Sequence, residues 1–187
     1  LHYPLRRQRQ MCIRDSHEIE TMLPTMLAAK RIIQKKHPGI TWHLRIAPGL
    51  DANFIRAHCE EDIRLDTELP RADLAIVKSG TSSFEMAVLG IPEIICYSTS
   101  GLNYLIAKTF VKVDHIGMPN IILARPAVPE LIQEALTSEA IAREAFHLIE
   151  DKERFIRMQE DFRELRSRLG TNKPSERVAA WIQDMIA

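Results

Sequence analysis

The sequence predicts a doubly wound α/β domain, in which helices cover both faces of a parallel sheet, followed by a helical tail. Short apolar runs typical of buried strands, of which Asp73–Lys78 is the clearest, alternate with segments of helical periodicity. The composition agrees, because 187 residues with 45% hydrophobic and 27% charged side chains suit one globular domain. From about residue 138 onward the pattern is helical almost throughout, with interruptions at Asp151, Gly170 and Pro174.

Composition also excludes several classes of protein. The 25 Lys and Arg residues balance the 25 Asp and Glu residues, so no net charge points to nucleic acid as a partner. The three cysteines, Cys12, Cys59 and Cys96, are odd in number and too widely spaced for a disulfide framework or a zinc site. The histidines include no pair four residues apart and no HExxH, so no metal site is expected. No other cofactor is expected either. No apolar run approaches the roughly 18–20 residues that span a bilayer, so any membrane contact is expected to be peripheral.

The first part of the chain is expected to hold an irregular arm, a helix, a strand and a second helix. Residues 1–16 are basic and lack apolar periodicity, which predicts a disordered arm or a segment foreign to the gene. An apolar stripe from Glu18 predicts a helix that ends at Pro38-Gly39. Ile40–Ala47 has the pattern of a strand, and Asp51 is placed to cap the helix that follows.

The central part of the chain alternates between predicted strands and helices, which favours right-handed crossovers between parallel strands. The expected elements, in order, are the strand Asp73–Lys78, the helix Ser82–Leu89 ended by Gly90, the strand Pro92–Tyr97, the helix Leu102–Val111, the short strand Asn120–Leu123 and a helix opened by Pro129.

The first candidate site follows the clearest strand, at the carboxyl edge where doubly wound sheets bind ligands. Ser79, Gly80 and Thr81 form a turn of small residues, and the free N–H groups of the next helix favour a phosphate there. Thr81 and Ser82 can cap that helix. Glu85 lies one helical turn beyond Thr81, where its carboxylate suits sugar hydroxyls. Together these residues describe a nucleotide site, while a simple helix N-cap with a surface glutamate is the alternative.

A second unusual stretch runs from His115 to Asn120 and combines His, Gly, Pro and Asn. The Asn120 side chain offers a donor and an acceptor, as recognition of a base or ribose requires. A structural turn is the other interpretation of this stretch. Glu130 and Gln133 lie close together at a predicted helix start, where capping and solvation explain them equally well.

Several segments together resemble the nucleotide-binding half of the lipid-A-disaccharide synthase family, over about residues 17–170. The SGTxxxE element, Ser79 to Glu85, occurs across many glycosyltransferases with two Rossmann-like halves, the GT-B fold. The LAKxxVKV-like and PNIILA segments, in this order, are more specific to the family. The segments that carry the resemblance are Ala72–Glu85, Gly90–Pro92, Tyr97, Tyr104–Lys108, Val111–Val113, Met118–Ala124 and Pro129–Gln133.

The resemblance implies three parts of the chain: residues 1–16 as a non-native or disordered arm, residues 17–170 as a UDP-sugar-binding, Rossmann-like half of a GT-B fold, and residues 171–187 as a C-terminal helix. It implies that Ser79, Gly80 and Thr81, with Ser82, lie by the UDP phosphates. Glu85 would then lie by the ribose and Asn120 in the donor site. No catalytic residue is expected in this chain, since the general base of the family belongs to the N-terminal half.

The resemblance also implies an inverting transfer of 2,3-diacylglucosamine from UDP to 2,3-diacylglucosamine 1-phosphate (lipid X), giving the lipid A disaccharide 1-phosphate and UDP. The expected partners are UDP-2,3-diacylglucosamine, lipid X and the inner-membrane surface, with no nucleic acid. The expected location is the cytoplasm, at the periphery of the inner membrane, and a homodimer is compatible with the sequence. Lys30, Arg31, Lys35 and Lys36 make a small basic face that solvated side chains explain as well as a membrane does.

One departure from the family pattern lies in residues 12–19. Where the family reads P-G-S-R-x-x-E-I, Asp15 stands at the position of the arginine, and a carboxylate would repel a diphosphate. Two alternatives to the family function stay open. One is another GT-B enzyme that uses a UDP-sugar, such as the peptidoglycan GlcNAc transferase or a UDP-GlcNAc 2-epimerase, and the other is a non-catalytic nucleotide-binding fragment.

Overall fold

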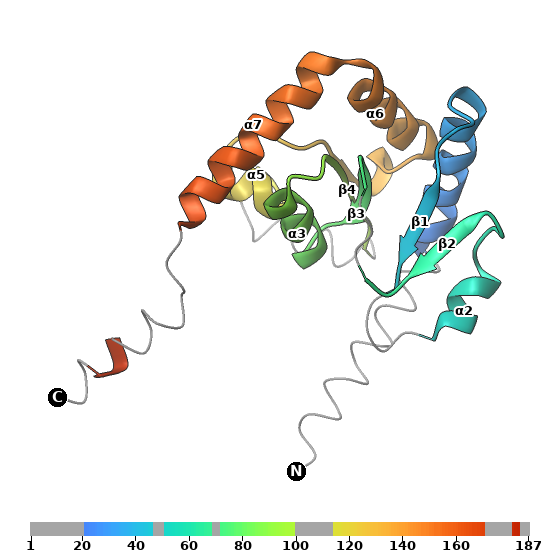
Figure 1. Ribbon diagram of the computed structural model, residues 1–187, viewed down its shortest axis with the longest axis horizontal. Coiled ribbons are helices and arrows are strands. Elements are labelled where there is room, and N and C mark those ends of the chain that lie inside the picture. The colour runs from blue at the N-terminus through green and yellow to red at the C-terminus, as the bar shows by residue number, and fades with distance from the viewer. Residues whose placement is uncertain (1–20, 47–50, 69–71, 100–113, 171–180, 184–187) are drawn as a thin grey trace, which may run out of the picture.

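The computed structural model describes residues 21–46, 51–68, 72–99, 114–170 and 181–183 (Figure 1). All strand pairs in this part of the chain are parallel, which confirms the α/β class. The strands form two sheets rather than the single sheet expected. The first sheet pairs β1 (Trp42–Arg45) with β2 (Ile63–Asp66), and the second has the order β3 (Ala75–Lys78), β4 (Glu93–Tyr97), β5 (Glu130–Ile132).

Helices α3 (Thr81–Leu89) and α6 (Ser138–Glu150) pack against the second sheet. In Figure 1, α7 runs across α3 and α5, and the three helices contact one another. The central strand β4 is buried on both faces, since Ile94, Ile95 and Cys96 are all excluded from solvent. The described helices are residues 21–36, α2 (Ala52–Ala57), α3 (Thr81–Leu89), α5 (Met118–Leu123), α6 (Ser138–Glu150) and α7 (Lys152–Leu169), with a 3-10 turn η1 (Gln133–Ala135).

Several helix boundaries follow the predicted local signals. The carboxylate of Asp51 accepts a hydrogen bond from the Asn53 N–H at 2.8 Å and caps α2. Gly90 ends α3 in the left-handed conformation, with φ of 76°, which favours glycine. Asp151 separates α6 from α7 and caps the latter through the N–H groups of Glu153 and Arg154. These signals involve neighbours in sequence, which is why the sequence suffices to predict them.

Three expectations about elements are wrong. Asn120–Leu123 is the end of helix α5 and not a strand, because Met118-Pro119 opens a helical turn there. Pro129 precedes strand β5 and not a helix, because the free edge of β4 is available to it: the Ile95 N–H donates to the Pro129 carbonyl at 2.9 Å. The strand β2 was not expected at all, and its four residues acquire their pairing only from β1.

Some expectations fall outside the described residues: the arm of residues 1–16, the helix Leu102–Val111 and most of the C-terminal helix, of which residues 181–183 are helical. Within the part of the chain that the structure describes, no helix combines the length and the apolar character needed to cross a membrane.

Candidate functional site

The turn after β3 has the backbone that the sequence predicts for a ligand-binding edge. Gly80 has φ of 142° and ψ of −151°, a conformation that side-chain-bearing residues rarely adopt. Among the described residues the space around it is open, because a Cβ at this position would meet none of their atoms within 4 Å. The constraint is therefore one of conformation, and the turn leaves room for a ligand close to the backbone.

The start of α3 differs from the expectation in one respect. Gly80, and neither Thr81 nor Ser82, occupies the N-cap, and no side chain of the described residues accepts a hydrogen bond from the first N–H groups of α3. Thr81 and Ser82 are instead the first helical residues and are exposed. An uncapped start leaves N–H groups of the first turn free to bind an anion, and the helix dipole favours a negative charge there.

Glu85 lies one turn further along α3 and is held by an ion pair with Arg45, the last residue of β1. Both side chains are partly exposed, 42% for Glu85 and 37% for Arg45, so the pair remains accessible to a ligand. Arg45 was not among the site residues predicted from the sequence. Its position at the carboxyl end of a predicted strand was the available signal, since the carboxyl ends of parallel strands carry the ligand site.

The structure brings the two singled-out stretches together. The Ser79 hydroxyl, in the turn after β3, donates a hydrogen bond of 2.9 Å to the Ile116 carbonyl, in the stretch from His115 to Asn120. These residues are 37 positions apart in sequence. The turn of Ser79 and Gly80, after β3, is therefore in direct contact with the segment that contains Ile116.

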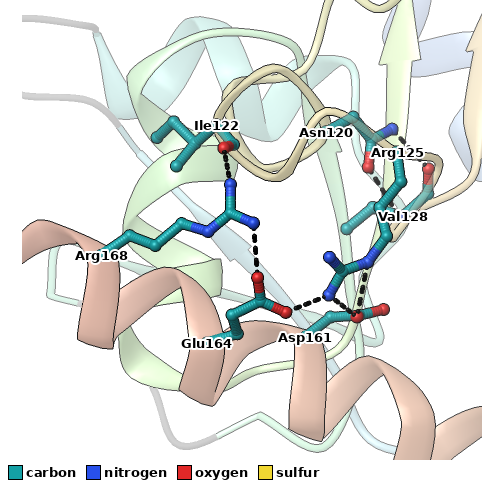
Figure 2. Close-up of polar contacts among 7 residues, drawn as sticks. All are labelled: Asn120, Ile122, Arg125, Val128, Asp161, Glu164 and Arg168. Atoms are coloured by element: carbon teal, nitrogen blue, oxygen red, sulfur yellow. Dashed lines mark hydrogen bonds and ion pairs between the residues drawn. The ribbon is translucent and has the colours of Figure 1, made fainter.

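Asn120 is buried, with 1% of its surface exposed, and its side chain faces the loop before β5. Its amide nitrogen donates to the Val128 carbonyl at 2.8 Å and to a Glu130 carboxylate oxygen at 2.7 Å. Its amide oxygen accepts from the Val128 N–H at 2.8 Å, a contact visible in Figure 2. The donor and acceptor that the sequence offered to a ligand are thus both engaged within the protein.

Two residues that the sequence analysis left to capping or solvation bind backbone groups of other segments. Glu130 accepts hydrogen bonds from the N–H groups of Ile116 and Gly117. The side-chain amide of Gln133 pairs with both backbone groups of Thr99, at 2.8 and 3.0 Å. Gln133 has a positive φ of 50°, which is uncommon for a residue other than glycine. In the sequence, the only sign that Glu130 and Gln133 bind backbone groups was that they flank the apolar pair Leu131-Ile132.

Ion pairs fasten α7 to the segment that carries Asn120 (Figure 2). Arg125 contacts Asp161 and Glu164 of α7, each at 2.5 Å, and hydrogen bonds to Glu164 and then Asp161 raise the pKa of its guanidinium above the usual range. Arg168 donates to the Ile122 carbonyl at the end of α5 and pairs with Glu164. Helix α7 therefore holds the end of α5 and the residue that follows its C-cap in place.

The described part of the chain contains no metal centre. Within residues 21–46, 51–68, 72–99, 114–170 and 181–183, no three His, Cys, Asp or Glu side chains come close enough to hold a metal ion. The buried Cys96 is unsuited to nucleophilic chemistry, because burial raises the pKa of its thiol to about 12.

Parallel strands, with an open glycine turn and a helix start at the carboxyl edge, define a Rossmann-like α/β domain of the kind that forms one half of a GT-B glycosyltransferase. The chain belongs to the lipid-A-disaccharide synthetase family, whose family model matches residues 12–183.

Individual relatives agree with the family match. The chain is 34% identical over 178 residues to the lipid-A-disaccharide synthase of Syntrophus aciditrophicus, an alignment that covers 90% of this chain and 46% of the relative. It is 32% identical, with the same coverage, to the lipid-A-disaccharide synthase of Geobacter metallireducens. The corresponding protein of Trichlorobacter lovleyi is 34% identical over 177 residues. The chain spans about half the length of these curated relatives.

Proposed function

We propose that this chain is the UDP-sugar-binding half of a lipid-A-disaccharide synthase, a glycosyltransferase of lipid A biosynthesis. The reaction would transfer 2,3-diacylglucosamine from UDP to lipid X with inversion, releasing UDP. The observation that carries the proposal is the open Ser79-Gly80 turn before an uncapped α3, with the Glu85 carboxylate one turn further on. The family match supports the same assignment.

The turn after β3 supplies the contacts that a diphosphate needs. The first-turn N–H groups of Gly80, Thr81 and Ser82 are the proposed donors to the phosphates, with the positive end of the α3 dipole behind them. The same groups would stabilise the charge that develops on UDP as it departs. This assistance requires no metal.

Glu85 is the proposed ligand of the ribose hydroxyls, which a carboxylate accepts well. Its pairing with Arg45 offsets the negative charge that would otherwise face the diphosphate. For Asn120 we propose an indirect place in the donor site, since its amide holds the loop that Ser79 contacts. We place the general base for the acceptor hydroxyl in the other half of the longer enzyme, so this half is proposed to be inactive alone.

The lipid substrates imply contact with the inner-membrane surface, and we propose that the cytoplasmic enzyme binds there peripherally, either as a monomer or as a homodimer. The basic face noted in the sequence contributes little to such contact. Lys30 and Arg31 pair with Glu60, and Lys36 pairs with Glu150, so these charges are neutralised within the chain. We therefore place the membrane-binding surface elsewhere in the longer enzyme.

Replacing Glu85 with alanine is expected to weaken binding of UDP by roughly tenfold or more, because the hydrogen bonds of a carboxylate to the ribose are lost. A thermal-shift titration with UDP, UMP and ADP, followed by calorimetry, measures this. UDP should raise the midpoint most, UMP less because it lacks one phosphate, and ADP least. Glu134→Ala is the control, since Glu134 is exposed and belongs to η1 rather than to α3.

The same titration separates the competing assignments. Equal stabilisation by ADP and UDP would contradict a uridine site and favour a general nucleotide-binding domain. UDP binding that survives Glu85→Ala would remove Glu85 from the site. If the complete enzyme releases UDP from UDP-GlcNAc and not from the acylated donor, a different GT-B enzyme is the better assignment.

Replacing Arg45 with methionine is expected to lower UDP affinity about 3–10-fold, because Glu85 then presents an unbalanced charge to the diphosphate. The free energy of unfolding should change by less than about 1 kcal/mol, since the ion pair is partly exposed. Calorimetry and urea unfolding measure the two quantities. Arg64→Met, at an exposed position on β2, is the matched control. Unchanged UDP affinity in Arg45→Met would show that the pair serves the fold alone.

A further inference from the structure

Glu130, the first residue of β5, binds three donors from a segment that precedes it in the chain. One carboxylate oxygen accepts from the Ile116 N–H at 3.0 Å, and the other accepts from the Gly117 N–H at 2.9 Å and from the Asn120 amide at 2.7 Å. Gly117 is the N-cap of α5 and Ile116 precedes it, so Glu130 supports the start of α5 by binding the N-cap N–H from outside the helix, as the N3 side chain of a capping box does from within.

The close fit of this contact depends on Gly117. A Cβ at Gly117 would lie 2.9 Å from a Glu130 carboxylate oxygen and would collide with the Ile95 side chain. Glycine therefore lets the backbone approach both β4 and the Glu130 carboxylate. A carboxylate is also the one side chain of this length that offers two acceptors and no donor, so an amide at position 130 would set an N–H group against an N–H group.

The same peptide segment reaches the candidate nucleotide site. The Ile116 residue whose N–H is held by Glu130 accepts the Ser79 hydroxyl with its carbonyl, at 2.9 Å. Ser79 is the neighbour of Gly80, whose unusual backbone conformation opens the start of α3. A continuous path of hydrogen bonds therefore runs from Glu130 through Ile116 to Ser79.

We propose that Glu130 is a positioning residue for the nucleotide site, a role that rests on the function proposed above. Its carboxylate holds the Ile116 carbonyl in place, the carbonyl orients Ser79, and Ser79 maintains the turn that presents the first N–H groups of α3 to the phosphates. Glu130 itself touches no ligand in this arrangement. Its effect on binding passes through Ile116 and Ser79.

The test compares Glu130→Gln with the control Glu134→Gln in the 187-residue chain. The first readout is the position of the Ser79, Gly80 and Thr81 amide resonances in the absence of nucleotide. We expect them to move in Glu130→Gln and to stay in place in Glu134→Gln. The second readout is the calorimetric affinity for UDP, which should fall about tenfold in Glu130→Gln because the turn is no longer held in its binding conformation.

Ser79→Ala provides a second variant that breaks the same path without altering Glu130 or the cap of α5. It should move the Ile116 and Gly117 resonances, and in its background Glu130→Gln should weaken UDP binding by less than in the original chain. If Glu130→Gln acted only through the general fold, its effect on UDP affinity would add to that of Ser79→Ala. That additivity, or unmoved Ser79–Thr81 resonances in Glu130→Gln, would overturn the proposal.

Failure of the proposed function gives a different result. A chain that binds no UDP at all would refute the nucleotide site, and with it the effect of Glu130 on affinity. The resonances of the nucleotide-free chain would still decide whether Glu130 orders the turn after β3.

Discussion

Replacing Glu93 with methionine is expected to raise the free energy of unfolding at pH 7 by about 3 kcal/mol, since each pH unit above the ordinary carboxyl pKa corresponds to about 1.36 kcal/mol. Glu93 begins β4, has none of its surface exposed, and neither carboxylate oxygen has a hydrogen-bond partner among the described residues. Burial raises the pKa of this carboxyl from 4.5 to about 9. The folded chain therefore keeps Glu93 protonated at neutral pH.

The stability of the unsubstituted chain should consequently fall as the pH rises from about 4.5 to about 9. In that range the unfolded chain releases the Glu93 proton while the folded chain retains it, so rising pH favours the unfolded state. At pH 4 both states are protonated, and the pH-dependent gain from the substitution should be absent. Urea unfolding at several pH values measures the slope.

Two variants separate the effect of Glu93 ionisation from the effect of burying a polar side chain. Glu93→Gln keeps the size and a polar group but cannot ionise, so it should remove the pH dependence that Glu93 contributes without the full gain of Glu93→Met. Glu139→Gln, at an exposed position in α6, should leave the slope unchanged. An equal pH slope in the original chain and in Glu93→Met would refute a protonated Glu93 in the folded state.

The double substitution Glu60→Gln with Asp62→Asn is expected to cost about 3–5 kcal/mol, because it leaves a buried ammonium group without its countercharges. The Lys30 side chain is 5% exposed and lies 2.6 Å from both Glu60 and Asp62. Burial alone would lower the pKa of Lys30, but hydrogen bonds to Asp62 and Glu60 outweigh that effect and raise it. Lys30 thus stays charged and ties the helix of residues 21–36 to the segment before β2.

Removing the lysine in place of the two acids should lower the free energy of unfolding much less. Lys30→Met leaves the two acids, which are 25% and 48% exposed and can be hydrated once the lysine is gone. We expect a loss of about 1 kcal/mol or less, since a similar apolar side chain replaces the buried charge. Urea unfolding compares the variants, with Glu61→Gln as the control because Glu61 is exposed between the two acids. Equal losses on both sides of the ion pair would contradict this account.

Much of the fold was predictable because its signals are local. The strands β3 and β4 are recognisable in the sequence as apolar runs. Asp51, Gly90 and Asp151 mark helix ends through contacts with residues next to them in the chain. The errors fall on short segments of uncertain periodicity. Residues 120–123 have an apolar run that fits a strand or a helix, and the structure of their surroundings decides between them.

The candidate site divides in the same way. The order of Ser79, Gly80, Thr81 and Glu85 after a buried strand was enough to predict an anion-binding turn with a carboxylate one helical turn away. The partners of these residues were not predictable, because Arg45 and Ile116 lie 40 and 37 positions from Glu85 and Ser79. No periodic pattern links residues at such separations.

The amino-acid sequence by itself determined the α/β class, the turn at the end of β3 and the family to which the chain belongs, since each depends on local order along the chain. The tertiary structure decided which polar groups are free. It showed that Lys30 is buried and paired, that Asn120 and Glu130 bind the backbone, and that Glu93 is enclosed with no partner in the described part of the chain. The physical reason is that hydrogen bonding and burial depend on which distant segments pack against each other, and the local pattern of apolar and polar residues does not show which segments do so.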